Sequence, residues 1–216
     1  MENKKKLKYI DIFSWCWWLS LWLFNSWLWE WLFAIEKNKD AFSTLEYNLI
    51  SKKNHFTFPK WLEQKQHDIN ELLENENLKE LVWKVDLVAG WPPCQGFSLA
   101  GKRNVNDIRN SLVHSYIKFI EIVKPKVIFF ENVKWFCAPF KDKKWDNCIA
   151  FSNVVIERLK GIWYEDAVHE ILDFSLFWVP QSRKRFIIVA TLKGNAKDFF
   201  SFIKVHTSDC YYILLM

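Results

Sequence analysis

The stretch VDLVAGWPPCQGFS, residues 85–98, joins an apolar strand to a stiff loop and decides the fold. Residues 85–89 form a short apolar run, which is typical of a strand buried on both faces. The long loop that follows, residues 90–106, contains Pro92 and Pro93, and each proline fixes its own backbone. A buried strand that ends in a stiff loop is typical of the edge where α/β proteins bind their ligands.

Outward from this strand, the apolar pattern alternates between the periods of strands and of helices. We expect strands at residues 8–13, 32–36, 85–89, 126–130, 167–172 and 185–190, with a short strand end at 66–69. Helices are expected at residues 19–25, 39–47, 70–81, 111–123 and 154–159. This order predicts an α/β protein with a doubly wound, mostly parallel sheet that helices cover on both faces.

Composition fits a globular domain and limits the partners. With 216 residues, 50% hydrophobic and 25% charged, the chain is long enough for one domain with a sizeable core. A net charge of +5 is compatible with a polyanionic partner but does not establish one. The five cysteines form no C-x-x-C pair, so we expect no disulfide framework and no metal site. A reducing, cytoplasmic location fits this cysteine usage.

Residues 12–29 form a run without a charged side chain, preceded by lysines, as in a membrane anchor. The run also contains three serines and an asparagine, and much of its bulk is tryptophan, which prefers the bilayer interface to the centre of a spanning helix. We therefore expect no membrane association. A membrane-anchored protein stays open as an alternative.

Residues that follow the predicted strands are the candidates for ligand binding. Glu36 closes the second strand, where a carboxylate is suited to hydrogen bonds with ribose hydroxyls, although a solvated strand end beside Lys37 would look the same. Asp68 could bind a ligand or cap the helix that follows. Cys94 has the geometry of a presented nucleophile, because two prolines precede it and Gln95-Gly96 follow, although most cysteines are small buried hydrophobes.

Three motifs then occur in order: Trp91-Pro92-Pro93-Cys94-Gln95-Gly96-Phe97-Ser98, Glu131-Asn132-Val133 and Gln181-Ser182-Arg183-Lys184-Arg185. Together they resemble the motifs of the C5-cytosine DNA methyltransferases. The Asp11-Ile12-Phe13-Ser14 opening and Phe177-Trp178-Val179-Pro180 are similar to this family too, so the resemblance covers about residues 8–192. It implies the Rossmann-like fold of S-adenosylmethionine-dependent methyltransferases and methyl transfer to C5 of cytosine in double-stranded DNA.

The resemblance also implies the catalytic roles. Cys94 would be the thiolate that adds to C6 of cytosine and makes C5 nucleophilic. Glu131 would hold and protonate N3, while Arg183 and Arg185 would contact the O2 side of the base and order the active-site loop. Because none of these ring atoms can be reached in a stacked duplex, the cytosine would have to be flipped out. Without the resemblance, Glu131 and the arginines could equally be a strand-end carboxylate and a solvated basic turn.

For the cofactor, S-adenosyl-L-methionine, the resemblance implies a pocket at the strand ends. Phe13 would lie against the adenine, and Glu36 would bind the ribose. Asp68 and Ile69 would lie at the adenine edge. Under the methionine portion we expect the loop of Ser14, Trp15, Cys16, Trp17 and Trp18. Pro93 and Leu112 are further candidates for the lining of this pocket.

The sequence departs from the family's pattern at tryptophans. The family has glycine at the positions of Trp15, Trp17, Trp18, Trp22, Trp27, Trp91, Trp135, Trp163 and Trp178. The chain has 14 Trp and 5 Gly, whereas average usage would give roughly 15 Gly. Our hypothesis is that the gene reads UGA as glycine, and that Trp29, Trp31, Trp61, Trp83 and Trp145 could belong to the same set. The rival interpretation is a decayed enzyme with real tryptophans.

The resemblance ends before the family's target-recognition domain, which would read the DNA sequence. We expect a catalytic, cofactor-binding domain at residues 1–195 and a truncated or aberrant tail at 196–216. A second chain supplying the missing part and a cognate restriction endonuclease are partners that the resemblance suggests. The alternatives are an inactive fragment or nucleic-acid-binding remnant, and a tRNA cytosine-5 methyltransferase.

Overall fold

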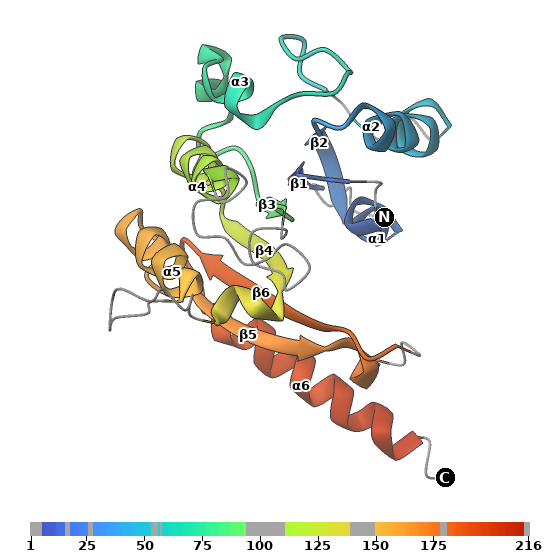
Figure 1. Cartoon of the computed structure of the whole chain (residues 1–216), viewed down its shortest axis with the longest axis vertical. Coiled ribbons are helices and arrows are strands. Elements are labelled where there is room, and N and C mark those ends of the chain that lie inside the picture. The colour runs from blue at the N-terminus through green and yellow to red at the C-terminus, as the bar shows by residue number, and fades with distance from the viewer. Residues whose placement is uncertain are drawn as a thin grey trace, which may run out of the picture. The chain divides into compact units, whose positions relative to one another are not determined.

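The structure is a computed structural model that describes residues 6–15, 18–25, 28–52, 56, 58–93, 111–138, 150–177 and 181–213 (Figure 1). Within these ranges, the side chains of residues 18, 19, 22, 24 and 206–213 are not described. The chain divides into two compact units. The first comprises residues 1–92 and 111–127, and the second comprises residues 93–110 and 128–216. Each unit is described by itself.

Three parallel strands form the centre of the first unit. They are β1 (Leu7–Ile12), β2 (Trp29–Ile35) and β3 (Leu87–Gly90), in the order β2-β1-β3. Ile12, at the end of β1, is in register with Ile35 of β2 and with Gly90 of β3. The three strands therefore end at the same edge, and the segments that leave them start side by side.

The helices of the first unit are α1 (Trp18–Asn25), α2 (Lys39–Leu45) with its continuation η1 (Glu46–Ser51), α3 (Ile69–Leu73), η2 (Glu76–Leu81) and α4 (Ser111–Val123). The apolar face of α4 is buried, and Tyr116 shows how closely it packs on the sheet. A Cβ atom at Gly90 would lie 2.3 Å from Cε2 of Tyr116, so this position of β3 admits only glycine unless the ring moves. The Tyr116 hydroxyl donates a hydrogen bond to the carbonyl oxygen of Val88.

The second unit contains β4 (Val127–Val133), whose first residue belongs to the first unit, β5 (Val168–Asp173) and β6 (Lys184–Thr191), in the order β4-β6-β5. Its helices are η4 (Lys134–Cys137), α5 (Phe151–Gly161), η5 (Phe174–Phe177) and α6 (Ala196–Ile213). The last two strands are antiparallel, with Asp173 opposite Lys184. Ala196 and Phe200 of α6 are buried against Ile187 and Val189 of β6.

Most predicted elements are present, with shifted ends, and three features differ from the prediction. The helix predicted at residues 70–81 is split in two, because the side chain of Asn75 caps a new 3₁₀ helix by accepting a hydrogen bond from the backbone N–H of Asn77. No strand end is present at residues 66–69. Helix α6 was not predicted, and its buried Phe200 shows that part of the expected tail packs on the sheet.

Candidate active site

The predicted catalytic carboxylate and one predicted arginine form an ion pair in the second unit. Glu131 lies near the carboxyl end of β4, and Arg185 is the second residue of β6. The distance from Arg185 Nε to Glu131 Oε1 is 2.7 Å. The side chains are 20% and 11% exposed, respectively, so solvent screens this pair only weakly. The order of the strands therefore brings together two residues that are 54 positions apart in the sequence.

Burial raises the pKa of Glu131 to about 7. Desolvation is the largest cause, because a charged carboxylate loses the water that stabilises it. The positive charges of Arg185 and Arg183 act in the opposite direction and favour the ionised form. The balance leaves Glu131 able to exist in both protonation states near neutral pH, which is the property that a proton donor and acceptor needs.

A cavity of about 620 Å³ is lined by Arg185 of this pair, and its size is within the range of small-molecule sites. Its lining comes from the end of β4, from η4 and from the segment that leads into β6, namely Val133, Lys134, Trp135, Gln181, Ser182, Arg183, Lys184 and Arg185. The cavity thus gathers four basic side chains, which suits an anionic ligand such as a nucleotide.

An aromatic cluster fixes the wall of this cavity. Phe136 of η4 is fully buried, and its ring packs against Phe130, Phe151 and Phe186, with ring centroids 5.1 to 5.5 Å apart. Phe130 directly precedes Glu131, and Phe186 directly follows Arg185. The same contacts that bury the rings therefore hold the backbone of both charged residues in place.

The predicted nucleophile, Cys94, lies outside the described residues, as do Cys16 and Trp17. Trp18 is described only through its backbone, as the first residue of α1. Pro93 is half-buried. The relation of Cys94 to Glu131 and Arg185 therefore stays a prediction.

In the first unit, the predicted cofactor loop leaves the carboxyl end of β1. The backbone N–H groups of Phe13 and Ser14 both donate to the carbonyl oxygen of Ile35, at 2.8 and 3.1 Å. Both residues are buried, and the Oγ atom of Ser14 has no hydrogen-bond partner among the described residues. A buried hydroxyl without a partner is unfavourable, which marks this loop as a place where a ligand can bind.

Glu36 directly follows β2, as predicted, and its carboxylate holds the loop. Its Oε2 accepts a hydrogen bond from the backbone N–H of Trp15 at 3.0 Å, and its Oε1 accepts one from Asn38 N–H at 2.8 Å. The indole Nε1 of Trp15 donates to the carbonyl oxygen of Trp91 at 3.0 Å. The side chain of Trp15 thus spans from the end of β1 to the segment after β3, across the predicted cofactor site.

Asp68 is the N-cap of α3: its carboxylate accepts a hydrogen bond from the backbone N–H of Asn70 at 2.9 Å. It also pairs with Lys37 Nζ at 2.7 Å. Burial opposes the ionised form, but the hydrogen bonds from Lys37 and Asn70 hold the pKa of Asp68 below its usual value. Ile69 is buried, and Leu112 is partly exposed in the first turn of α4. Both interpretations of Asp68 remain compatible with this geometry, since one carboxylate can cap a helix and contact a ligand.

Three tryptophans have the backbone conformation that favours glycine. Trp15, Trp83 and Trp163 have φ angles of 49°, 60° and 83°, in the left-handed region. Trp163 follows α5 in a Schellman motif, in which Tyr164 N–H donates to Leu159 O and Trp163 N–H to Lys160 O. In this motif the position of Trp163 is usually glycine.

Trp83 occupies the third position of a type II turn. Lys84 N–H donates to the carbonyl oxygen of Leu81, and Val82 has φ −53° and ψ 123°, as the second residue of such a turn does. The third residue of a type II turn needs a positive φ, hence glycine or asparagine. By contrast, Trp31 lies within β2 and is fully buried against Tyr9 and Phe56. The backbone of the described residues therefore distinguishes two kinds of tryptophan position.

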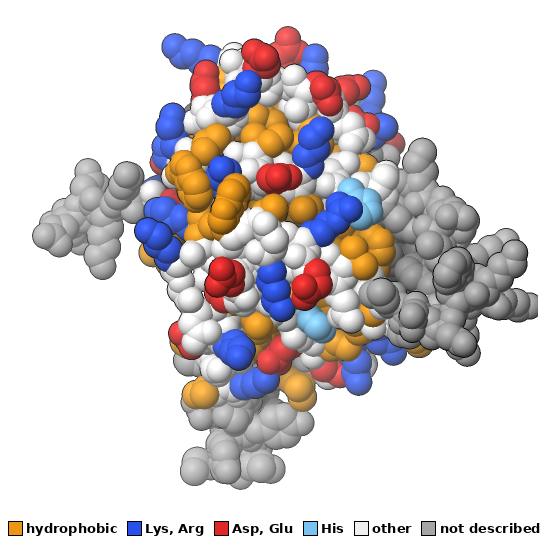
Figure 2. Space-filling view, turned by 90° about the vertical axis from the view of Figure 1, so that its left-hand side faces the viewer, with side chains coloured by type: hydrophobic (Ala, Val, Ile, Leu, Met, Phe, Trp, Pro, Cys, Tyr) orange, Lys and Arg blue, Asp and Glu red, His pale blue; other side chains and the backbone are white. Residues whose placement is uncertain are grey.

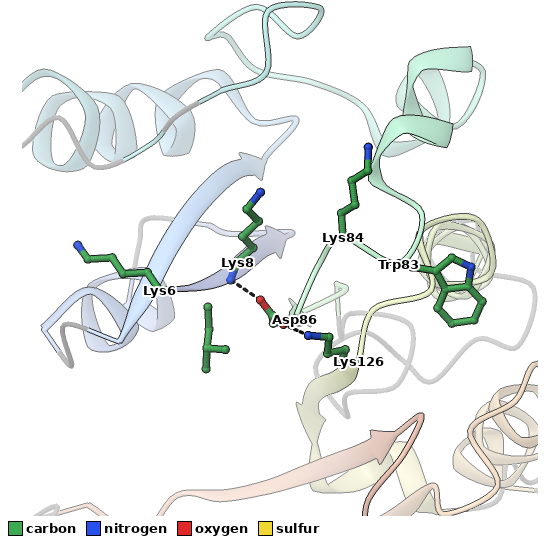
Figure 3. Close-up of a pocket in the computed structure, with 7 residues that line it drawn as sticks. Lys6, Lys8, Trp83, Lys84, Asp86 and Lys126 are labelled. Carbon is green, nitrogen blue, oxygen red and sulfur yellow. Dashed lines mark hydrogen bonds and ion pairs between the residues drawn. The ribbon is translucent and has the colours of Figure 1, made fainter. Parts of the chain in front are cut away.

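A second cavity, of about 370 Å³, lies at the opposite edge of the first unit, where β1 and β3 begin (Figure 3). Asp86 is at its centre: its carboxylate accepts hydrogen bonds from Lys8 N–H at 2.7 Å and from Lys126 Nζ at 2.6 Å. The side chains of Lys6 and Lys84 also line it. Because this cavity lies away from the carboxyl ends of the strands, it is not part of the candidate active site.

The charge and the hydropathy of the described residues bear on two possibilities raised by the sequence, a polyanionic partner and a membrane anchor. Among the described residues visible in Figure 2, basic and acidic side chains are interspersed, without a large patch of one sign. In the described part of the chain, no helix is both long enough and apolar enough to cross a membrane. The uncharged run at residues 12–29 is divided among the end of β1, α1 and the start of β2.

Sequence comparison finds a family whose model matches this chain: residues 7–212 match C-5 cytosine-specific DNA methylase. Type II methyltransferase M.PspPI of Psychrobacter sp. is 30% identical over 83% of this chain and 38% of its own length. Type II methyltransferase M.HindV of Haemophilus influenzae is 33% identical over 88% of this chain and 54% of its own length. The chain therefore spans about half or less of these relatives.

Solved structures with a similar fold include a DNA modification methyltransferase encoded within an E. coli prophage, which has a TM-score of 0.63 and 24% sequence identity. The match covers 86% of this chain and 47% of that one. The S. pombe Dnmt2 methyltransferase has a TM-score of 0.56 and 18% identity, over 91% of this chain and 55% of that one. These likenesses confirm the predicted α/β fold of the Rossmann-like methyltransferase type.

Proposed function

Because the chain belongs to the C-5 cytosine-specific DNA methylase family, we propose that it carries the catalytic part of a DNA (cytosine-5-)-methyltransferase. The substrate would be a cytosine flipped out of double-stranded DNA. The observation that carries this proposal is the Glu131–Arg185 pair, because the sheet joins the second and third motifs of the sequence at one cavity.

The chemistry proposed for the chain's own residues begins at Cys94. Its thiolate adds to C6 of the cytosine, and the electron pair of the C5–C6 double bond moves toward C5 while N3 accepts a proton. Glu131 supplies that proton, for which a carboxyl group with a pKa of about 7 is suited. After the methyl group is on C5, a base removes the C5 proton, the C5–C6 double bond re-forms as the thiolate leaves C6, and N3 returns its proton to the Glu131 carboxylate.

Arg185 holds Glu131 and Arg183 faces the cavity in this proposal. The 2.7 Å contact to Arg185 Nε fixes the orientation of the Glu131 carboxyl. In this proposal the other oxygen, Oε2, would face the base. Arg183 lines the same cavity and acts on Glu131 electrostatically. A guanidinium group offers several donors in one plane, which suits the O2 atom of cytosine and the neighbouring phosphates.

S-adenosylmethionine, which this family implies, would supply the activated methyl group. The polar groups at the strand ends of the first unit suit this cofactor. Ser14 Oγ is buried without a partner among the described residues, and the Glu36 carboxylate directly follows β2, where a ribose would bind. Phe13 and Ser14 would enclose the adenine and methionine portions. The side chain of Trp15 does not suit the cofactor, because its indole lies across this site and donates a hydrogen bond to Trp91 O.

We further propose that glycine stands at Trp15, Trp83 and Trp163 in the functional protein. Their φ angles of 49°, 60° and 83° support this. Because Phe13 and Lys124 also have positive φ angles, the type II turn at Trp83 and the Schellman motif at Trp163 carry most of the argument. Left-handed backbone is unfavourable for a residue with a Cβ atom. A genetic code that reads UGA as glycine accounts for all three, and it also removes the indole from the cofactor site. The remaining positions of the sequence-based set, such as Trp91 and Trp135, follow from the same code.

The proposed partners are double-stranded DNA and a further polypeptide part that reads its sequence, in the same or a second chain. With DNA as the substrate, the proposal includes a cytoplasmic location. A cognate restriction endonuclease is proposed from the names of the Type II relatives.

The test uses duplex DNA in which 5-fluorocytosine replaces cytosine. Fluorine cannot leave C5 as a proton does, so the reaction stops with Cys94 bonded to C6. We expect a protein–DNA adduct that resists denaturation, requires S-adenosylmethionine, and yields a crosslinked peptide containing Cys94. The Cys94→Ala variant, with the fold retained by circular dichroism, is the control and forms no adduct. An adduct at another cysteine, or none with an active preparation, would overturn the proposal.

A further inference from the structure

A buried chain of three hydroxyl and carboxyl groups connects β1 to α1. The Ser20 hydroxyl donates to Asp11 Oδ2 at 2.6 Å, and the oxygens of Ser20 and Tyr9 are 2.9 Å apart. Tyr9 and Ser20 have no exposed surface, and Asp11 is 2% exposed. From the sequence, Asp11 was recognised only as part of the opening motif. Its place in this buried chain was not predicted, although an acidic residue within an apolar strand is an unusual feature that could have signalled it.

The Asp11–Ser20 hydrogen bond spans the proposed cofactor loop. Asp11 lies two residues before Phe13, and Ser20 lies in the first turn of α1, just after the loop. The incoming side of the loop is held separately, by the hydrogen bonds of Phe13 and Ser14 to Ile35 O. Asp11 therefore fixes the first turn of α1 relative to β1.

Burial of this carboxylate has a cost that a merely structural residue would avoid. Desolvation raises the pKa of Asp11 to about 7, against the hydrogen bonds from Ser20 and Tyr9, and the negative charge of Glu36 raises it further. The strand neighbours Ala34 and Ala89 carry no charge. Among the described residues, no lysine or arginine pairs with Asp11.

We propose that Asp11 is a positioning residue for S-adenosylmethionine: through Ser20 it holds the start of α1 against the end of β1, where the cofactor would bind. This inference rests on the proposed function, because it assumes that the loop binds this cofactor. Ionised Asp11 accepts a stronger hydrogen bond from Ser20 than protonated Asp11 does, since charge-assisted bonds are shorter and stronger. The start of α1 is therefore held more firmly at pH 8 than at pH 6.

The test measures the dissociation constant of S-adenosylmethionine by calorimetry, at pH 6 and pH 8, for the 216-residue chain. At each tryptophan position that could be glycine, the chain used in this test carries the residue found by mass determination of the native protein. We expect Ser20→Ala and Asp11→Ala to weaken binding by about 10- to 100-fold at pH 8, the effect of losing a hydrogen bond to a charged group. In Asp11→Asn, which keeps an acceptor for Ser20 but cannot ionise, the pH 8 to pH 6 affinity ratio should fall toward one.

Ser152→Ala is the matched control, because Ser152 is a fully buried serine of the second unit whose Oγ has no partner among the described residues. It should bind the cofactor as the parent chain does. Unchanged affinity in Ser20→Ala, or a pH dependence in Asp11→Asn equal to that of the parent, would overturn the inference. If the parent chain itself binds no S-adenosylmethionine, the proposed function fails instead, so the two failures are distinguishable.

Discussion

The Nε atom of Arg185 lies 2.7 Å from Oε1 of Glu131, and this contact joins the start of β6 to the end of β4. The carboxylate is nearly buried, and its protonation state depends on both its desolvation and the two arginines, Arg183 and Arg185, which line a cavity. Three of the predictions below depend on this pair or on that cavity.

Glu131→Gln should lower methyl transfer by about 10²- to 10⁴-fold, the usual contribution of one proton-transferring group. The amide keeps a hydrogen-bond donor for the base but has no acidic proton. Single-turnover kinetics with duplex DNA would measure the loss. Binding of S-adenosylmethionine is the internal control and should not change, because Glu131 is not among the residues proposed to bind it. A variant with full activity would exclude Glu131 as the proton donor.

Glu131 should contribute a part of the free energy of unfolding that decreases as the pH rises from about 4.5 to about 7. Its folded pKa is raised, so the folded state binds the proton more tightly than the unfolded state does, and this stabilisation is lost as the pH passes the folded pKa. Urea unfolding of the parent and of Glu131→Gln across this range isolates the contribution. Equal pH dependence in both proteins would contradict the raised pKa.

Arg185→Ala should raise the pKa of Glu131 further, because it removes the nearer of two positive charges that favour the ionised carboxylate. Infrared spectroscopy of the carboxyl band would follow this titration. Lys184→Ala is a suitable control: the neighbouring lysine pairs instead with Asp173, at 3.7 Å. If both variants shift the Glu131 titration alike, the effect is one of general charge and not of the pair.

Replacing two tryptophans by glycine should change stability in opposite directions. Trp163→Gly should raise the free energy of unfolding by about 0.5 to 1 kcal/mol, because relief of the left-handed backbone exceeds the entropy cost of glycine. Trp31→Gly should lower it by about 3 to 5 kcal/mol or more, because the side chain fills the core beside Tyr9 and Phe56. Destabilisation in both variants would count against glycine at position 163.

Native protein should show the masses of peptides with glycine at positions 15, 83 and 163. Peptide mass determination after purification from the native host measures this directly, since glycine and tryptophan differ by the whole indole side chain. Trp31 serves as a comparison, because its buried, strand conformation does not require glycine. Tryptophan in all these peptides, or UGG codons in the gene, would contradict the recoding.

Much of the fold could be predicted from the sequence, because the apolar runs that become β1, β3 and α4 have clear periodicity. The ends of elements were harder, since they depend on local capping: Asn75 splits a continuous helical pattern by capping η2. Helix α6 was missed because its burial depends on β6, through Phe200, and not on its own pattern.

The candidate site was predictable where short motifs carry it and unpredictable where contacts span the sequence. Glu131 pairs with Arg185, and Arg183 lines the same cavity as Arg185, while the catalytic roles of all three stay a prediction. Which of the two arginines would pair with Glu131 depends on the register of β4 and β6 and could not be read from spacing. The Asp11–Ser20 bond was missed for a similar reason, because a serine and an aspartate nine residues apart give no pattern.

The most direct test of the central claim is transfer of a tritiated methyl group from S-adenosylmethionine by the protein purified from its native host. Duplex DNA and tRNA are offered separately, and the labelled nucleosides are identified by chromatography. We predict label in 5-methylcytosine from duplex DNA. Label in N4-methylcytosine, in N6-methyladenine or only in tRNA, or no label above that of heat-inactivated protein, would contradict the account.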